Sequence, residues 1–255
     1  MTRRVTRKAV AAAELPWTEV HRRACAGAVA LLPSGSTEAH GPHLPRNVDV
    51  VVSLEVCRRA SLRLEARGTP SVIFPPIAYG VTDFAASFAG TVTVGRGTML
   101  AYLSDVLRGI ASHGFARIAV VNHHLEPAHF RVVHEAAQHA ASESKASIVV
   151  PDHRRPPFAS QLGEEFTRGG SHAGRYETSL MLAAAPSLVD EDVRAKLADL
   201  PVDLPAKIRA GARTFLDCGG DQAYFGSPAA ASAHEGHRLL DLLAAATEAS
   251  LTPAS

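Results

Sequence analysis

The sequence predicts an α/β protein in which a parallel sheet is covered by helices on both faces. Short apolar runs typical of buried strands alternate with longer segments whose apolar residues recur at helical spacing. The alternation continues to residue 150 without an internal repeat or a linker. Parallel strands joined by helices bury both faces of their sheet. We therefore expect a single domain over residues 1–255, in which residues 1–15 form a flexible tail.

The expected elements follow this alternation along the chain. Strands are predicted at residues 28–32, 71–77, 117–121 and 146–150, where apolar and β-branched residues cluster. Helices are predicted at residues 18–26, 50–65, 98–112, 128–142, 176–185 and 239–251. Residues 78–91 and 154–170 are predicted to be loops, and residues 188–211 fit either a helix or a surface loop.

The composition is that of an ordinary globular protein, with 46% apolar and 20% charged residues. A net charge of +1 creates no field that would favour nucleic acid or an anionic membrane, so neither partner is expected. No apolar run approaches the roughly 18 residues of a membrane span, and the basic N-terminus does not fit a signal peptide. The three cysteines form no C-x-x-C pair, which favours a reducing cytoplasm over a disulfide framework.

A first cluster of chemically active side chains occupies residues 33–49, between an expected strand and an expected helix. Glu38 and His40 are two positions apart, so in an extended segment both side chains point to the same side. Asp49 lies where the helix should begin, a position that suits an acidic residue. Loops that follow strands line the crevice of open α/β sheets, so this stretch is a candidate metal site.

A second cluster, residues 122–127, repeats the pattern after another expected strand. His124 and Glu126 are again two positions apart, and Pro127 holds Glu126 in extended geometry. Parallel strands end at one edge of their sheet, so the two clusters should meet there. With Asp49 they offer two imidazoles and three carboxylates, which suits two divalent ions with a bridging carboxylate. Nitrogen and oxygen ligands without thiolate favour Zn, Mn or Fe over Ca or Mg.

A third cluster, residues 169–179, places His172 and Glu177 at the entry to an expected helix. His172 could exchange a proton near the metals, and Glu177 could bind a metal or orient a ligand. His43 is expected to hydrogen-bond within its own loop, and His123 is expected to be buried in a packed loop. The remaining histidines are expected at the surface or at helix ends: His21, His113, His129, His134, His139, His153, His234 and His237.

Other catalytic signatures are incomplete. Residues 34–36 do not form the G-x-S-x-G turn of a nucleophile elbow. Residues 95–97 lack the third glycine of a dinucleotide-binding loop, and the chain has no phosphate-binding loop motif. No basic stretch interleaved with aromatic residues indicates nucleic-acid binding. The acid and imidazole clusters therefore carry the functional hypothesis.

These clusters resemble the motifs of the creatininase (creatinine amidohydrolase) family. Residues 35–45, GSTEAHGPHLP, followed by Asp49, are similar to the first metal motif of that family. Residues 172–174 and 177–179 are similar to its later signature, and residues 88–93, 226–229 and 234–236 match weaker elements. The resemblance covers residues 27–240. It implies a three-layer α/β/α sandwich with a mostly parallel central sheet, assembled as a homo-oligomer that is commonly a hexamer.

The resemblance also implies a dinuclear metal centre that hydrolyses an amide C–N bond. One ion would be held by Glu38, Asp49 and His124. The second ion would be held by His40 and by Asp49 as the bridge, together with either Glu126 or Glu177. Proton transfer is assigned to His172 and Glu126. Leu125 stands where creatininase has a tyrosine beside its substrate, and the expected substrate contacts are Leu125 and Tyr79.

The resulting hypothesis is a metal-dependent amidohydrolase in which a metal-activated water attacks a small amide substrate, including cyclic amides. Three alternatives stay open. The chain could be a peptidase that trims a modified peptide, as in mycofactocin maturation. It could be a formamide deformylase, or a non-catalytic metal-binding protein. In each case we expect a cytoplasmic homo-oligomer.

Overall fold

The structure is a computed structural model that describes residues 9–169 and 171–251. The described residues form a four-stranded parallel sheet in the order β2-β1-β3-β4. Its strands are β1 (Val29–Ser34), β2 (Ser71–Ile73), β3 (Arg117–Asn122) and β4 (Ser147–Val149). The predicted parallel sheet is confirmed. β2 ends earlier than expected because two prolines follow at positions 75 and 76, and proline cannot donate a ladder hydrogen bond.

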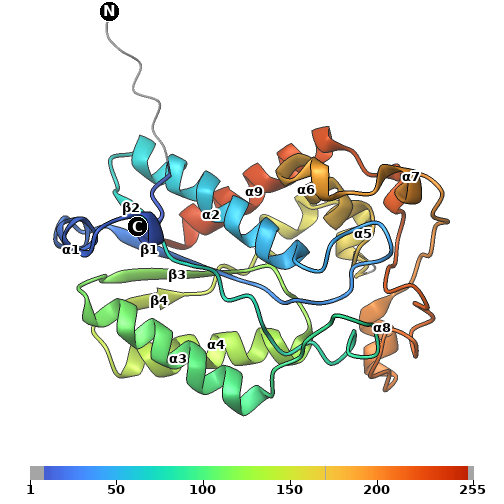
Figure 1. Cartoon of the computed structure of the whole chain (residues 1–255), viewed down its shortest axis with the longest axis horizontal. Helices are drawn as coiled ribbons and strands as arrows, with labels where there is room; N and C mark the ends of the chain where they lie inside the picture. Colours follow the sequence, from blue (N-terminus) through green and yellow to red (C-terminus); the bar gives the residue numbers. More distant parts are fainter. Residues whose placement is uncertain (1–8, 170, 252–255) are drawn as a thin grey trace, which may run out of the picture.

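Helices cover both faces of the sheet, which confirms the three-layer α/β/α sandwich (Figure 1). One face is covered by α2 (Val48–Ala66), α6 (Arg175–Ala184) and α9 (Ala233–Leu251). The other face is covered by α3 (Arg96–Ser112) and α4 (Pro127–Ser142). Successive side chains of a strand point to opposite faces. In β1, Leu31 therefore packs in the first core and Leu32 in the second, and both are fully buried.

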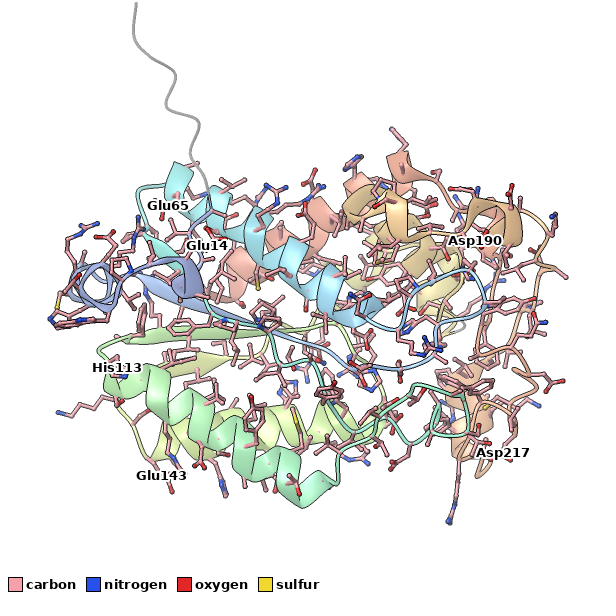
Figure 2. All side chains as sticks on the ribbon, viewed as in Figure 1. Glu14, Glu65, His113, Glu143, Asp190 and Asp217 are labelled. Atoms are coloured by element: carbon pink, nitrogen blue, oxygen red, sulfur yellow. The ribbon has the colours of Figure 1, made fainter. Side chains whose placement is uncertain are left out.

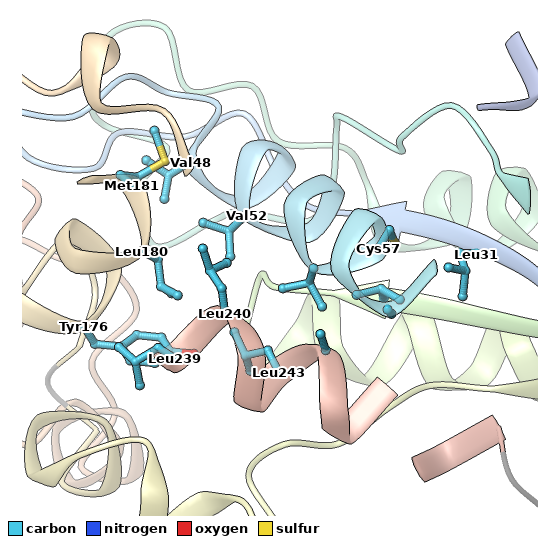
Figure 3. Packing of buried hydrophobic residues seen from close by; sticks show 14 of the residues in the cluster. Leu31, Val48, Val52, Cys57, Tyr176, Leu180, Met181, Leu239, Leu240 and Leu243 are labelled. Carbon is cyan, nitrogen blue, oxygen red and sulfur yellow. The ribbon is translucent and has the colours of Figure 1, made fainter. Parts of the chain in front are cut away.

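The core on the α2 side joins three helices that are far apart in the sequence. Val52 of α2, Leu180 of α6 and Leu240 of α9 gather in one apolar cluster (Figure 3). Burial of one such side chain stabilises the fold by about 1.5–3 kcal/mol. The helix α6 therefore has a fixed place against the sheet, and this matters because α6 carries Glu177.

The segment between α6 and α9 contains short helices, which resolves the open expectation for residues 188–211. Asp190 accepts a hydrogen bond from the Val193 N–H at 2.9 Å, and Asp203 accepts one from the Ala206 N–H at 2.8 Å. These caps begin two short helices, and the chain between them is irregular. The remaining helices of the described chain are α1 (Trp17–Cys25), α5 (Glu164–Thr167), α7 (Glu191–Arg194), α8 (Leu204–Arg209), and the 3₁₀ turns Ala12–Glu14, Ala159–Gln161, Pro186–Leu188 and Pro228–Ala230.

The expectation of a flexible tail over residues 1–15 is wrong for the second half of that segment. Ala11 forms a parallel bridge with Ile73 of β2, and the Ile73 N–H donates to the carbonyl of Val10 at 2.8 Å. These contacts extend the pairing at the β2 edge of the sheet. Residues 1–8 lie outside the described residues. Among the described helices, we find none with the length and apolar character needed to cross a membrane.

The contact between α6 and α9 predicts opposite effects of the same substitution at two helical glycines. A Cβ at Gly236 of α9 would overlap the backbone oxygen of Ser179 in α6, whereas a Cβ at Gly109 of α3 meets no atom within 4 Å. We expect Gly236→Ala to lower the free energy of unfolding by about 1–3 kcal/mol. Gly109→Ala should raise it by about 0.5–1 kcal/mol through its helix propensity. Urea denaturation measures both, and an unchanged Gly236→Ala midpoint would contradict the packing.

Candidate metal centre

The carboxyl ends of β1 and β3 bring the first two sequence clusters together. Ser34, the last residue of β1, lies opposite Asn122, the last residue of β3. The loops that follow therefore leave the sheet side by side, one carrying Glu38 and the other carrying His124. Asp49 joins them from the first turn of α2, where the loop after β1 runs close against the helix. A Cβ at Gly35 would lie only 2.6 Å from the Asp49 Cβ, so this approach requires a glycine.

Asp49 lies between two imidazoles and offers one oxygen to each. Its Oδ2 lies 3.2 Å from His124 Nδ1, and its Oδ1 lies 3.5 Å from His40 Nε2. Glu38 Oε1 is 3.2 Å from the same His124 nitrogen, and Glu177 Oε2 is 3.6 Å from the same His40 nitrogen. All five side chains are buried. Asp49 thus offers its two oxygens to two different imidazoles.

Backbone carbonyls fix the orientation of three histidines. Nδ1 of His40 donates to the Glu38 carbonyl at 3.1 Å, and Nε2 of His124 donates to the Val81 carbonyl at 2.9 Å. Nε2 of His172 donates to the Ala39 carbonyl at 2.9 Å. We assign these tautomers because a carbonyl can only accept a hydrogen bond. When the ring is neutral, its second nitrogen carries a lone pair that faces the carboxylates, as in metal-binding histidines.

Hydrogen bonds also orient the carboxylates. Glu38 accepts a hydrogen bond from the Thr82 hydroxyl. Glu126 accepts from the N–H groups of Asp83 at 3.1 Å and Phe84 at 3.2 Å. Residues that were expected to form a plain loop therefore support two of the acidic side chains.

Glu177 is held by the backbone of its own cluster. It accepts from the Ala173 N–H at 2.7 Å. Ala173 is buried and has φ 52°, a left-handed conformation that is unfavourable for alanine. This strained turn directs the N–H toward Glu177 and places His172 beside the cluster, with Nδ1 3.8 Å from Glu38 Oε1 and 4.0 Å from Glu177 Oε2.

The concentration of negative charge determines the protonation of the two central histidines. Burial by itself lowers the pKa of His40, but Asp49, Glu177 and Glu38 outweigh burial and raise it to about 9. Burial likewise opposes a charge on His124, yet Glu38 and Asp49 raise its pKa well above the usual value. The cluster therefore attracts protons to the two nitrogen atoms that face Asp49. A divalent cation would compete for the same lone pairs and release those protons.

In two acids and one histidine of the site, unlike in His40 and His124, burial decides the direction of the pKa shift. Burial raises the pKa of Glu126 to about 7, against the opposing charge of His124. Burial also raises the pKa of Glu177 to about 7, against the opposing charge of His40. Burial and the neighbouring His40 charge lower the pKa of His172 to about 4, so its Nδ1 is unprotonated at neutral pH. Glu126 therefore has the pKa that suits proton exchange near pH 7.

The donor set fits metal ions. Three groups place their ligand atoms within 4.8 Å of one another: Glu38, His124 and Glu126; His40, Asp49 and Glu177; and Glu38, His40 and His172. His40 Nε2 and Asp49 Oδ2 are buried and form no hydrogen bond, which is costly unless a cation binds them. No cysteine belongs to these groups, so the ligands are nitrogen and oxygen atoms, as expected from the sequence.

A cavity of about 570 Å³ opens onto this cluster. Leu125, an expected substrate contact, lies in its wall together with Glu126 and His172. Tyr79, the other expected contact, is not brought to the site. Its side chain is 52% exposed and does not line the cavity, because the loop turns it outward before reaching Val81.

The other histidines are only partly where the sequence placed them. His123 is buried, as expected. His43 was expected to hydrogen-bond within its own loop, but its Nε2 lies 2.8 Å from the Thr178 hydroxyl of α6. His113 lies exposed at the end of α3, also as expected (Figure 2). His129 and His153 were expected at the surface but are buried. His129 Nε2 lies 3.1 Å from Asn122 Oδ1, and the His129 ring packs against His124. The sequence pattern around His129 does not predict these contacts.

Comparison with known proteins agrees with the class that the fold and site indicate, an α/β/α sandwich enzyme with a candidate metal site of nitrogen and oxygen ligands. A protein-family model described as creatinine amidohydrolase matches residues 13–251. The chain is 34% identical over 203 residues to creatinine amidohydrolase of Pseudomonas putida, which covers 72% of this chain and 75% of that protein. This chain belongs to the creatininase family and is an amidohydrolase of that family.

Further matches extend this comparison. The chain is 32% identical over 215 residues to a mycofactocin precursor peptide peptidase of Mycobacterium ulcerans, covering 82% of this chain and 78% of the peptidase. A solved mutant creatininase of Zn–Zn type superposes with TM-score 0.78 at 26% identity, covering 95% of this chain and 97% of that one. A manganese creatininase superposes with TM-score 0.73 at 27% identity over the same shares.

The position of Asp49 predicts that one substitution lowers stability more with metal than without it. In metal-loaded protein, we expect Asp49→Asn to lose bound metal and the accompanying stability, about 2.7 kcal/mol when free metal is 100-fold above its dissociation constant. In chelated protein, the same substitution should still destabilise, without the metal contribution, because it removes the pairing with His40 and His124 that holds the pKa of Asp49 well below its usual range. Glu55→Gln on the same helix, whose carboxylate instead pairs with Arg58 and Arg59, is the control. Metal analysis and thermal unfolding measure both, and full metal content in Asp49→Asn would contradict the assignment.

Proposed function

We propose that the chain holds two divalent ions, of Zn, Mn or Fe, and uses them to hydrolyse an amide C–N bond. Glu38, Asp49 and His124 would hold one ion, and His40, Asp49 and Glu177 would hold the other. The observation that carries this proposal is Asp49, whose two oxygens face different imidazoles. Solved relatives are described as Zn–Zn and Mn creatininases, which supports the same metals here.

The geometry favours Glu177 over Glu126 as the last ligand of the second ion. Glu177 groups with His40 and Asp49, whereas Glu126 groups with Glu38 and His124. The carboxylate of Glu126 also accepts two backbone N–H groups and lines the cavity, which leaves it beside the substrate. We therefore assign Glu126 to proton transfer.

When bound, such ions polarise an amide carbonyl and make water nucleophilic near neutral pH. The residues of this chain would then handle the protons. The attacking water transfers its proton to Glu126 as its oxygen bonds to the carbonyl carbon. Glu126 passes this proton to the amide nitrogen, which leaves as an amine. His172, fixed by the Ala39 carbonyl and with a free Nδ1, would orient the reacting group and accept its hydrogen bond.

Two substrate types are candidates, since the relatives include a creatinine amidohydrolase and a peptide peptidase. The cavity volume of about 570 Å³ lies within the roughly 300–1,000 Å³ range of pockets that enclose drug-sized ligands, which favours a substrate larger than a five-membered ring. A peptidase acting on a short or modified peptide is therefore the second candidate. The single-domain boundaries, the cytoplasmic location, the homo-oligomer and the formamide alternative stay predictions.

The proposed activity is tested with metal-loaded protein and its chelated form. Creatinine, N-formyl amines and short peptides are incubated with each, and mass spectrometry follows the addition of water across an amide. We expect hydrolysis of at least one class, lost on chelation and restored by Zn²⁺ or Mn²⁺. If the metal-loaded protein bound two ions and hydrolysed none of these amides, the proposed function would be wrong.

Substitutions at the site should separate metal binding from proton transfer. We expect Glu126→Gln and His172→Ala to keep both ions and to lower kcat by about 10²–10⁴, the usual contribution of proton transfer. Glu177→Gln should lose one ion. His113→Ala, at an exposed site, is the control. Metal analysis with steady-state kinetics measures these outcomes, and a metal-depleted Glu126→Gln protein would reverse the roles of the two glutamates.

A further inference from the structure

The cavity beside the metal residues has two chemically different parts. Its acidic lining residues are Glu38, Asp49, Glu126 and Glu177, all of which belong to the metal cluster. Much of the remaining wall is apolar and includes Phe84, Leu125, Phe166, Leu204, Ile208 and Phe215. Apart from the histidines of the site, the only charges in that described wall are two arginines, Arg154 and Arg209. A ligand that extends from the metal cluster would therefore meet both an apolar surface and positive charge.

The two arginines differ in whether their guanidinium groups are already paired within the protein. Arg154 donates to Asp152 from Nε at 2.8 Å and from Nη2 at 3.1 Å, and its guanidinium lies 3.5 Å from the centre of the Phe130 ring. The side chain of Arg209 is exposed, and no hydrogen bond or ion pair joins it to another described residue. The free positive charge of the cavity wall is therefore that of Arg209.

The backbone around Arg209 is firmly placed, although its side chain is free. Arg209 ends α8, whose Leu204, Pro205 and Ile208 also line the cavity. Leu204 is buried against the Phe215 and Phe225 cluster. Gly169 abuts the Pro205 ring so closely that a Cβ there would overlap it, which packs α8 against a loop that also lines the cavity. Arg209 is thus held at the cavity wall by packing.

An unpaired guanidinium matches the planar geometry of a carboxylate, to which it can donate two parallel hydrogen bonds. We propose that the substrate is an amide with an apolar segment that ends in a free carboxylate, as in an N-acyl amino acid or a short peptide, and that Arg209 binds this carboxylate. The proposal rests on the proposed amide hydrolysis and names the substrate class. Arg209 acts in recognition, so its removal should raise KM and leave kcat nearly unchanged.

The kinetic test uses matched pairs of substrates on metal-loaded enzyme. N-formyl-, N-acetyl- and alanyl-phenylalanine are each supplied as the free acid and as the methyl ester, and release of the acyl group is measured. We expect kcat/KM to be at least about tenfold higher for the acid. Arg209→Gln should raise KM for the acid about tenfold and leave the ester unchanged, and Arg209→Lys should restore part of the preference.

Lys207→Gln provides the matched control. Lys207 belongs to the same helix and carries the same charge, but it does not line the cavity. This variant should retain the wild-type preference for the acid. Equal preference for acid and ester in the wild type, or an Arg209→Gln enzyme that keeps the preference, would overturn the proposal.

A binding measurement separates this proposal from the proposed function. If no member of the panel is hydrolysed, calorimetric titration with 4-phenylbutyrate and with 4-phenylbutanol still tests Arg209. We expect the acid to bind more tightly than the alcohol, and Arg209→Gln to weaken the acid about tenfold without affecting the alcohol. Acid binding that is equal in both proteins but is lost on chelation would assign the carboxylate to the metals and would refute the role of Arg209.

Discussion

The site depends on one electrostatic constraint, the gathering of three buried carboxylates, Glu38, Asp49 and Glu177, beside one cavity. At an effective dielectric of about 20, two unit charges 4 Å apart interact by about 4 kcal/mol, so these acids repel one another strongly when ionised. Burial of charge is tolerated only with compensation. The raised pKa values of His40 and His124 show how the protein itself compensates, by holding protons at the nitrogens nearest to Asp49. Divalent ions would neutralise the same carboxylates with more positive charge than these protons supply.

The fold meets this constraint with rigid supports. Two adjacent parallel strands end at the same level, so their loops carry one acid and one imidazole each to a shared edge. A glycine lets the first loop touch the start of α2, from which Asp49 points between the imidazoles. Carbonyl groups then fix each ring by one nitrogen. Little freedom is left to the ligands, and this reduces the entropy lost on binding a metal.

Much of this arrangement was predictable from short-range patterns. Alternating strands and helices predicted the sheet, and the Glu38/His40 and His124/Glu126 spacings predicted the side chains that meet at its edge. The choice between Glu126 and Glu177 was not predictable. It depends on the left-handed turn at Ala173, which no propensity favours. His129 and His153 were misplaced for a related reason, since each is buried through partners distant in the sequence, His129 against Val81 and His153 against His123.

The loop between β2 and α3 both lines the cavity and supports the metal residues. Phe84 contributes to the wall and also donates its N–H to Glu126, while neighbouring Thr82 holds Glu38. A mutation that reshapes this loop to admit a new substrate would therefore disturb the catalytic acids as well. The part of the wall formed by α8 makes no hydrogen bond to those acids among the described residues and can vary at lower cost. Relatives that differ in substrate should therefore differ more in the sequence of α8 than in the sequence of the loop.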